Sequence, residues 1–115
     1  MPHITLEYSD NVLEKDFTDM LLQMHDLLST QLPTQLKNCK SRIICCHDYL
    51  IGDAGPKNAF VHLAILVLKG RSVELKNAIA AKLMQMLKEH FKNSAEKLDL
   101  QISVDIDDLP EVYQK

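Results

Sequence analysis

Four short segments of the chain have the apolar patterns of β-strands. Residues 3–8 and 98–106 alternate apolar and polar side chains, which is typical of strands with one buried face. Residues 40–49 have an apolar centre, and residues 59–68 form a nearly continuous apolar run rich in valine, isoleucine and leucine. A run of this kind is typical of a strand that is buried on both faces. We therefore predict four strands, of which the third is buried on both faces.

Two longer segments have the apolar spacing of amphipathic helices. The apolar residues stand at 13, 17, 20, 21, 24, 27 and 28 in the first segment, and at 75, 79, 83, 86, 87 and 91 in the second. This spacing predicts helices over residues 12–31 and 72–92. Asn11 and Glu14 have the spacing of a capping box for the first helix, and Ser72 can cap the second.

The predicted elements follow in the order strand–helix–strand, a loop at residues 52–56, and strand–helix–strand again. Parallel strands that are joined through a helix form a β-α-β unit. Two such units, at about 2–50 and 58–107, predict one α+β domain over 1–115. Its four-stranded sheet has both helices on one face. The other face is then left uncovered, and association of several copies of the chain would cover it.

Composition narrows the class of protein further. The chain has 115 residues, 46% of them hydrophobic and 25% charged, which is typical of a soluble globular domain. Its net charge of −3 argues against a general nucleic-acid binder. The longest apolar run, residues 59–68, is too short to cross a membrane. The chain opens without an export signal, so Cys39, Cys45 and Cys46 are expected to be free thiols in a cytoplasmic protein.

The first candidate for chemistry is Pro2, which leads directly into the first predicted strand. If Met1 is removed, Pro2 carries a secondary amine, and an α-amino group has a pKa of ~8. Burial and neighbouring cations would lower this pKa and let the amine accept a proton at neutral pH. Met-Pro is also a common chain start without a chemical role, and both interpretations stay open at this point.

The second candidate is a pair of arginines, because arginine binds planar carboxylates through two parallel hydrogen bonds. Of the thirteen basic residues, only Arg42 and Arg71 are arginines. Arg42 lies at the start of the second predicted strand, beside Lys40, and Arg71 lies where the third strand leads into a helix. Both positions are at an end of the predicted sheet and not on a helix surface, which favours an anion site. Structural ion pairs with the acidic residues are the alternative.

The histidines and cysteines give weaker signals. His62 lies within the third predicted strand and is expected to be a hydrogen-bonded core residue. Cys45-Cys46-His47 lacks the spacing of a zinc site, and no metal ligand set is predicted. No glycine-rich phosphate loop, nucleophile elbow or metalloprotease helix motif is present.

Several blocks of the sequence together resemble a known family. These blocks are Met1-Pro2-His3-Ile4, residues 7–11, Lys40-Ser41-Arg42, residues 59–63 and Gly70-Arg71-Ser72. They resemble the 5-carboxymethyl-2-hydroxymuconate Δ-isomerases of the tautomerase superfamily, which also contains 4-oxalocrotonate tautomerase and macrophage migration inhibitory factor. The resemblance covers nearly the whole chain, in the same order and at similar spacing.

The resemblance implies a homotrimer with a tautomerase-like fold, without metal or cofactor, whose partner is a small carboxylate substrate. Pro2 would act as the general base and acid that moves a proton on a carboxylate-bearing dienol. Arg71, together with Lys40 or Arg42, would bind the substrate carboxylates and stabilise the developing dienolate. Relatives commonly read Arg-Ser-Arg where this chain has Lys40-Ser41-Arg42, so the residue that makes the second contact stays open.

Two alternatives to this activity remain from the sequence. The chain could be a trimeric binding or structural protein that has the fold without the isomerase chemistry. It could also be a tautomerase for a different small enol acid. Retention of Met1 would favour the first alternative, because it would turn the Pro2 nitrogen into an amide.

Overall fold

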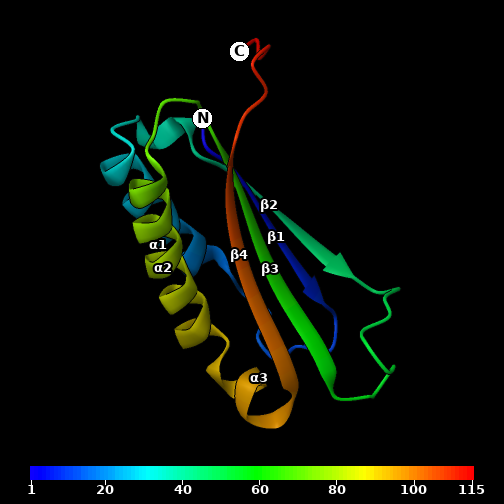
Figure 1. Ribbon diagram of the computed structural model, residues 1–115. Coiled ribbons are helices and arrows are strands. Elements are labelled where there is room, and N and C mark those ends of the chain that lie inside the picture. The colour runs from blue at the N-terminus through cyan, green and yellow to red at the C-terminus, as the bar shows by residue number, and fades with distance from the viewer.

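The four strands form one mixed sheet in the order β2-β1-β3-β4, and the helices lie on one face of it (Figure 1). The computed structural model describes residues 1–115. Its elements are β1 (His3–Ser9), α1 (Thr18–Gln31), η1 (Leu36–Asn38), β2 (Lys40–Cys46), β3 (Asn58–Val67), α2 (Val73–His90), α3 (Lys92–Lys97) and β4 (Asp99–Asp108). Each of the four predicted strands is present, and the α+β class is confirmed.

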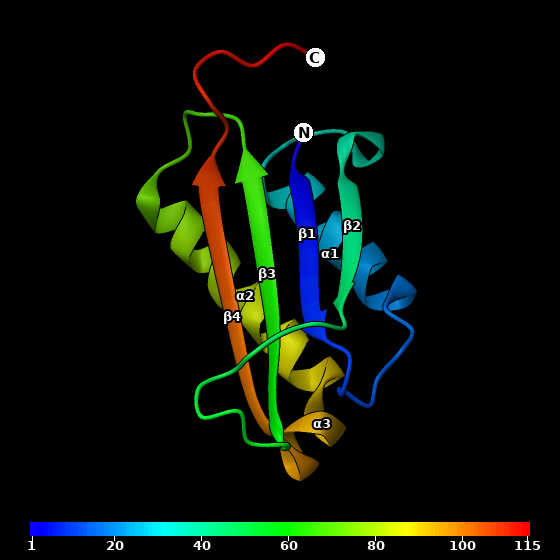
Figure 2. The same cartoon turned by 90° about the vertical axis from the view of Figure 1, so that its right-hand side faces the viewer.

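The sheet is built from the two predicted β-α-β units. β1 pairs in parallel with β2, and β3 pairs in parallel with β4. β1 and β3 pair antiparallel at the centre and join the two units. As a result, the start of β1 lies beside the end of β3. Figure 2 shows both termini of the chain at this end of the sheet.

The core lies between the sheet and the helices, where alternate strand residues point. Ile4 and Leu6 of β1 and Leu63 and Ile65 of β3 are completely buried. They pack in one cluster with the apolar faces of α1 and α2, including Met24, Leu28, Ile79, Leu83 and Leu87. Side chains of this kind contribute roughly 1.5–3 kcal/mol each when fully buried, so this cluster stabilises the arrangement of layers. No helix of the chain is long and apolar enough to span a membrane.

The first helix begins six residues later than the sequence predicts, at Thr18. The predicted capping box is wrong, because its two side chains bind distant parts of the chain. The Asn11 amide donates to the carbonyl of Asn58 over 2.8 Å, and the Glu14 carboxylate accepts from Ser94. These tertiary contacts replace the local capping bonds on which the pattern depends.

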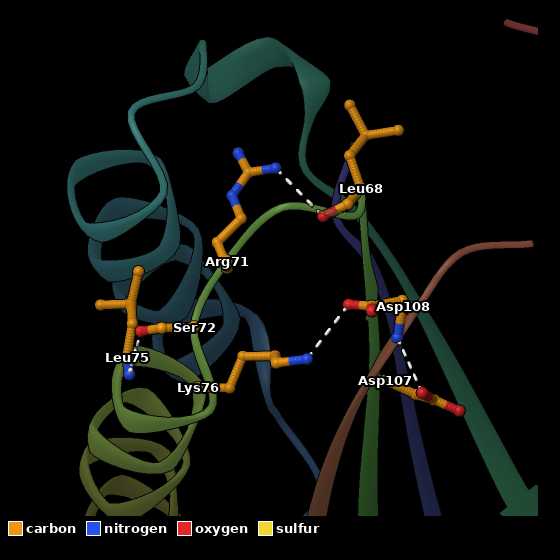
Figure 3. A network of polar contacts seen from close by, with 7 residues as sticks. All are labelled: Leu68, Arg71, Ser72, Leu75, Lys76, Asp107 and Asp108. Carbon is orange, nitrogen blue, oxygen red and sulfur yellow. Dashed lines mark hydrogen bonds and ion pairs between the residues drawn. The ribbon is translucent and has the colours of Figure 1, made fainter. Parts of the chain in front are cut away.

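The predicted cap of the second helix is confirmed, because the Ser72 hydroxyl accepts a hydrogen bond from the Leu75 N–H over 3.1 Å. Figure 3 shows this bond at the start of α2. The helix predicted over 72–92 corresponds to α2, and the completely buried Phe91 separates α2 from the short α3, which the sequence does not predict.

β3 is not buried on both faces, contrary to the prediction. Alternate residues point into the core, but the face turned away from the helices is open in the single chain, as Figure 2 shows. His62 lies on this open face and is therefore not a core histidine. Its ring is hydrogen-bonded to the Ser103 hydroxyl at 2.6 Å and to the Asp105 carboxylate at 2.9 Å. A continuous apolar run cannot reveal which face of a strand a single chain leaves uncovered.

Candidate functional site

Pro2 lies at the entrance to the sheet, immediately before β1. It is buried, and its carbonyl accepts a hydrogen bond from the Lys40 N–H over 3.2 Å, which extends the pairing of β1 and β2 by one step. Met1 precedes it in the structure and carries the amino group there. Burial and then the charge of Lys40 lower the pKa of that amine, and Arg71 also contributes to lowering it. The environment at this end of the sheet therefore favours a neutral amine.

Lys40 lies directly opposite His3 in the parallel register of β1 and β2. Its side chain is exposed, and its only hydrogen bond is to the carbonyl of Asn38, over 3.4 Å. The ammonium group makes no ion pair with any carboxylate. Lys40 is thus a free cation at the end of the sheet where Pro2 lies.

Arg42 follows two residues later and lies on the open face of the sheet. Both terminal nitrogens of its guanidinium donate to Nδ1 of His3, each over 3.2 Å. The side chain is otherwise exposed and has no carboxylate partner. Burial, followed by the charges of Arg42 and Lys40, lowers the pKa of His3 below its ordinary value.

Arg71 lies on the helix side of the same end, in the segment between β3 and α2. It follows Gly70, whose φ of +115° is a conformation that side chains other than glycine rarely adopt. Its guanidinium donates to the carbonyl of Leu68 over 3.1 Å, a bond drawn in Figure 3, and to that of Leu32 over 2.9 Å. The arginine therefore fastens the end of α1 to the turn after β3.

The structure brings Pro2, Lys40, Arg42 and Arg71 to one end of the sheet, as the sequence predicts, but not into one cluster. Arg42 points to the open face, whereas Arg71 binds backbone on the helix side. Neither arginine forms an ion pair, so the structural ion pairs considered from sequence are absent. All of these positive charges are free of acidic partners.

The hollows on the surface of the single chain lie elsewhere. One of about 540 Å³ lies between α1 and α2, and one of about 450 Å³ lies beside α3 and β4. Neither is lined by Pro2 or by the basic residues around it. No group of three histidine, cysteine, aspartate or glutamate side chains is placed to hold a metal ion, and the three cysteines are free.

Sequence reasoning missed two side chains at this end, His3 and Tyr113. They are 110 residues apart and form a hydrogen bond of 2.7 Å. Tyr113 belongs to the irregular tail that follows β4, which ends at Asp108. The only local signal was the position of His3 beside Pro2.

Comparison with known proteins decides the family. The model of the 5-carboxymethyl-2-hydroxymuconate isomerase family matches residues 2–115. The chain belongs to this family. It is 27% identical to a 5-carboxymethyl-2-hydroxymuconate Δ-isomerase of Escherichia coli over 110 residues, which cover 95% of this chain and 87% of the relative. The family is one of isomerases, and the family expected from the sequence blocks is confirmed.

Solved structures agree with this assignment. A 5-carboxymethyl-2-hydroxymuconate isomerase from Deinococcus radiodurans R1 superposes with a TM-score of 0.90 at 28% identity, over 99% of this chain and 88% of that one. The "Q0 fused 4-OT wild type symmetric trimer" superposes with a TM-score of 0.67 at 16% identity, over 95% of this chain and 86% of that one. The second likeness shows a shared fold.

Proposed function

We propose that this chain is a cofactor-independent isomerase of the 5-carboxymethyl-2-hydroxymuconate type, with Pro2 as its general base and acid. The observation that carries the proposal is the buried position of Pro2 beside cations that have no acidic partner. A substrate that bears several carboxylates would supply the missing negative charge. The membership of an isomerase family supports the reaction class.

The proton transfer requires the removal of Met1, which gives Pro2 a secondary amine. Burial and Lys40, the two main causes that lower the pKa of the present amino terminus, would act on the Pro2 amine as well. The neutral amine would take a proton from the substrate and leave a delocalised dienolate. The protonated amine would deliver the proton to a carbon of this dienolate, so the dienol becomes a conjugated ketone.

The cations would bind the substrate and stabilise the charge that forms on it. Arg71 and Lys40 lie within electrostatic reach of the amino terminus, since both contribute to the lowered pKa there. Arg42 is available on the open face for a further carboxylate. Fixed positive charges next to a developing dienolate lower the barrier to proton removal.

We also propose that the active form is a homotrimer. The open face of the sheet exposes apolar side chains, with Ile44 44% and Leu66 38% accessible, and burial of such side chains favours association. No surface hollow of the single chain includes Pro2, so neighbouring subunits would complete the pocket. The fold shared with a symmetric trimer supports this assembly.

The deciding experiment follows the ultraviolet absorbance of 5-carboxymethyl-2-hydroxymuconate after addition of Met-free protein. We expect the wild type to isomerise it and Pro2→Ala to lose at least about a hundredfold in kcat. Pro56→Ala, in the exposed loop before β3, is the matched control and should retain full activity. Equal rates for wild type and Pro2→Ala would overturn the proline mechanism. Mass spectrometry that finds Met1 fully retained would favour a non-catalytic role.

A further inference from the structure

The C-terminal tail returns to the end of the sheet where the chain begins. Leu109 anchors it, because this residue is 4% exposed and its N–H donates to the carbonyl of Val67 over 2.7 Å. The preceding Asp108 forms an ion pair of 3.2 Å with Lys76 of α2, drawn in Figure 3. These contacts fix the point from which the remaining residues reach toward the amino terminus, at the end of the sheet seen in Figure 2.

Tyr113 is the residue of this tail that contacts the site. Its ring is half-buried and stands edge-on to the ring of His3, with ring centres 6.0 Å apart and planes at 77°. The two side chains share the 2.7 Å hydrogen bond between the Tyr113 hydroxyl and Nε2 of His3. The hydroxyl itself donates toward the sulfur of Met1 over 3.6 Å. The Tyr113 oxygen accepts a hydrogen bond from Nε2 of His3 when that nitrogen carries the ring proton.

The other ring nitrogen of His3 is fixed by Arg42. A guanidinium group only donates hydrogen bonds, so Nδ1, which receives two of its N–H groups, must be unprotonated. The proton of the neutral ring is then on Nε2, which donates a hydrogen bond to the Tyr113 oxygen. The groups that shift the pKa of His3 are burial, Arg42, Lys40 and the amino terminus, and all of them lower it. His3 is consequently a neutral ring in one tautomer.

We propose that Tyr113 is a positioning residue that acts through His3 to hold the Arg42 guanidinium in place for a substrate carboxylate. This inference rests on the function proposed above. Arg42 has no acidic partner, and its side chain is exposed on the open side of the sheet. An arginine that is held in one orientation loses less side-chain entropy on binding a carboxylate than a free one does.

Loss of the Tyr113 hydroxyl would release this chain of contacts. Without the acceptor at Nε2, the ring can adopt the tautomer that carries its proton on Nδ1. A protonated Nδ1 cannot accept the hydrogen bonds from Arg42, because two donors would then face each other. The guanidinium group would move away from His3. Loss of one hydrogen bond of this kind corresponds to roughly a three- to tenfold change in an equilibrium constant.

The test measures the binding of cis,cis-muconate, a dicarboxylate without an enol group, by calorimetry on the Met-free protein. We expect Tyr113→Phe to raise the Kd about three- to tenfold, while kcat on the hydroxymuconate stays unchanged and its KM rises by the same factor. Tyr49→Phe is the matched control, since Tyr49 is a partly exposed tyrosine that donates to Asp10 on the loop after β1. It should leave the Kd unchanged.

A double-mutant cycle and an NMR spectrum distinguish a positioning role of Tyr113 from a general loss of structure. If Tyr113 acts through Arg42, adding Tyr113→Phe to Arg42→Ala should cost nothing further. Nitrogen NMR of His3 should show one tautomer in the wild type and a mixture in Tyr113→Phe. The inference would be overturned if the two substitutions raised the Kd independently, so that their factors multiply in the double variant. It would also be overturned if the tautomer of His3 stayed the same in Tyr113→Phe, or if the wild type bound no muconate. Muconate binding without isomerisation would overturn the proposed reaction alone.

Discussion

Glu14 and Ser94 are hydrogen-bonded to each other across eighty residues of sequence. The Glu14 carboxylate accepts from both the N–H and the hydroxyl of Ser94, and the same hydroxyl accepts from the Leu13 N–H over 2.8 Å. Ser94 is completely buried, so these are the partners that offset the loss of water from its polar atoms. The contact fastens the segment before α1 to the short helix α3.

We predict that Ser94→Ala lowers the free energy of unfolding by about 1–3 kcal/mol, because it removes one of the two hydrogen bonds to the Glu14 carboxylate and leaves the Leu13 N–H without its acceptor. Urea denaturation measures this change. Ser29→Ala is the control, since that hydroxyl bonds only the Asp26 carbonyl within α1. A Ser94→Ala protein as stable as the wild type would show that water replaces the hydroxyl at no cost.

Substitution of Arg71 should affect stability as well as activity. Its two terminal nitrogens bind carbonyls on different segments, those of Leu68 and Leu32, and a lysine cannot reach both. We therefore expect Arg71→Lys to lose about 1–2 kcal/mol of stability in denaturant titration although the charge is retained. Lys69→Arg, on an exposed neighbour, is the control. An unchanged midpoint for Arg71→Lys would show that the two backbone contacts are dispensable.

Gly70 should be difficult to replace for a reason of backbone geometry alone. Its φ is +115°, and a methyl group added to its Cα would meet no atom within 4 Å. Gly70→Ala should therefore destabilise the chain by about 1–3 kcal/mol through strain and not through a clash. Thermal denaturation measures the effect. If the variant is as stable as the wild type, the turn before Arg71 relaxes without cost.

The stability of the protein should fall in mildly acidic solution because of His25. Burial lowers the pKa of its ring below 6.5, and the ring is hydrogen-bonded to the Ser41 hydroxyl at 2.6 Å. The unfolded chain therefore binds a proton more readily than the folded one. The contribution is complete above the unfolded pKa of 6.5 and declines as the pH falls toward the lower folded pKa.

Denaturant titrations between neutral and mildly acidic pH test this expectation. His25→Gln should lose less stability over that range than the wild type. The pKa of His3 is also lowered and acts with the same sign, so the difference between the two proteins isolates His25. The carboxylates of Asp10 and Asp53, whose pKa values are lowered from 3.8, act only in stronger acid. Parallel curves for the two proteins would contradict the role of His25.

Periodicity alone predicts most of this fold, because strand and helix patterns depend on which side of an element is buried. The alternation at residues 3–8 and 98–106 and the helical spacing after Ser72 all correspond to elements of the structure. The pattern fails where a side chain has a distant partner. Asn11 and Glu14 are spaced as a local cap, yet they bind Asn58 and Ser94 instead.

The candidate site was predictable in its location but not in its internal contacts. Arginine at strand ends and proline at position 2 are visible in the sequence, and the structure brings them to one end of the sheet. Arg42 and Arg71 lie on opposite faces of the sheet. This separation depends on which face each residue of β2 points to and on the turn at Gly70. The contact of His3 with Tyr113 depends on where an irregular tail ends, and no local pattern specifies that.

The antiparallel pairing of β1 with β3 relates the two β-α-β halves by an approximate twofold axis, so the sheet has two ends of similar construction. At one end Pro2 precedes β1; at the other, Lys57 precedes β3. Only an amino terminus offers a free backbone amine, and Lys57 is bound on both sides by peptide bonds. Under the proposed mechanism, each chain therefore has one catalytic amine although its architecture is duplicated. Substitutions at the opposite end of the sheet would not affect the proton transfer.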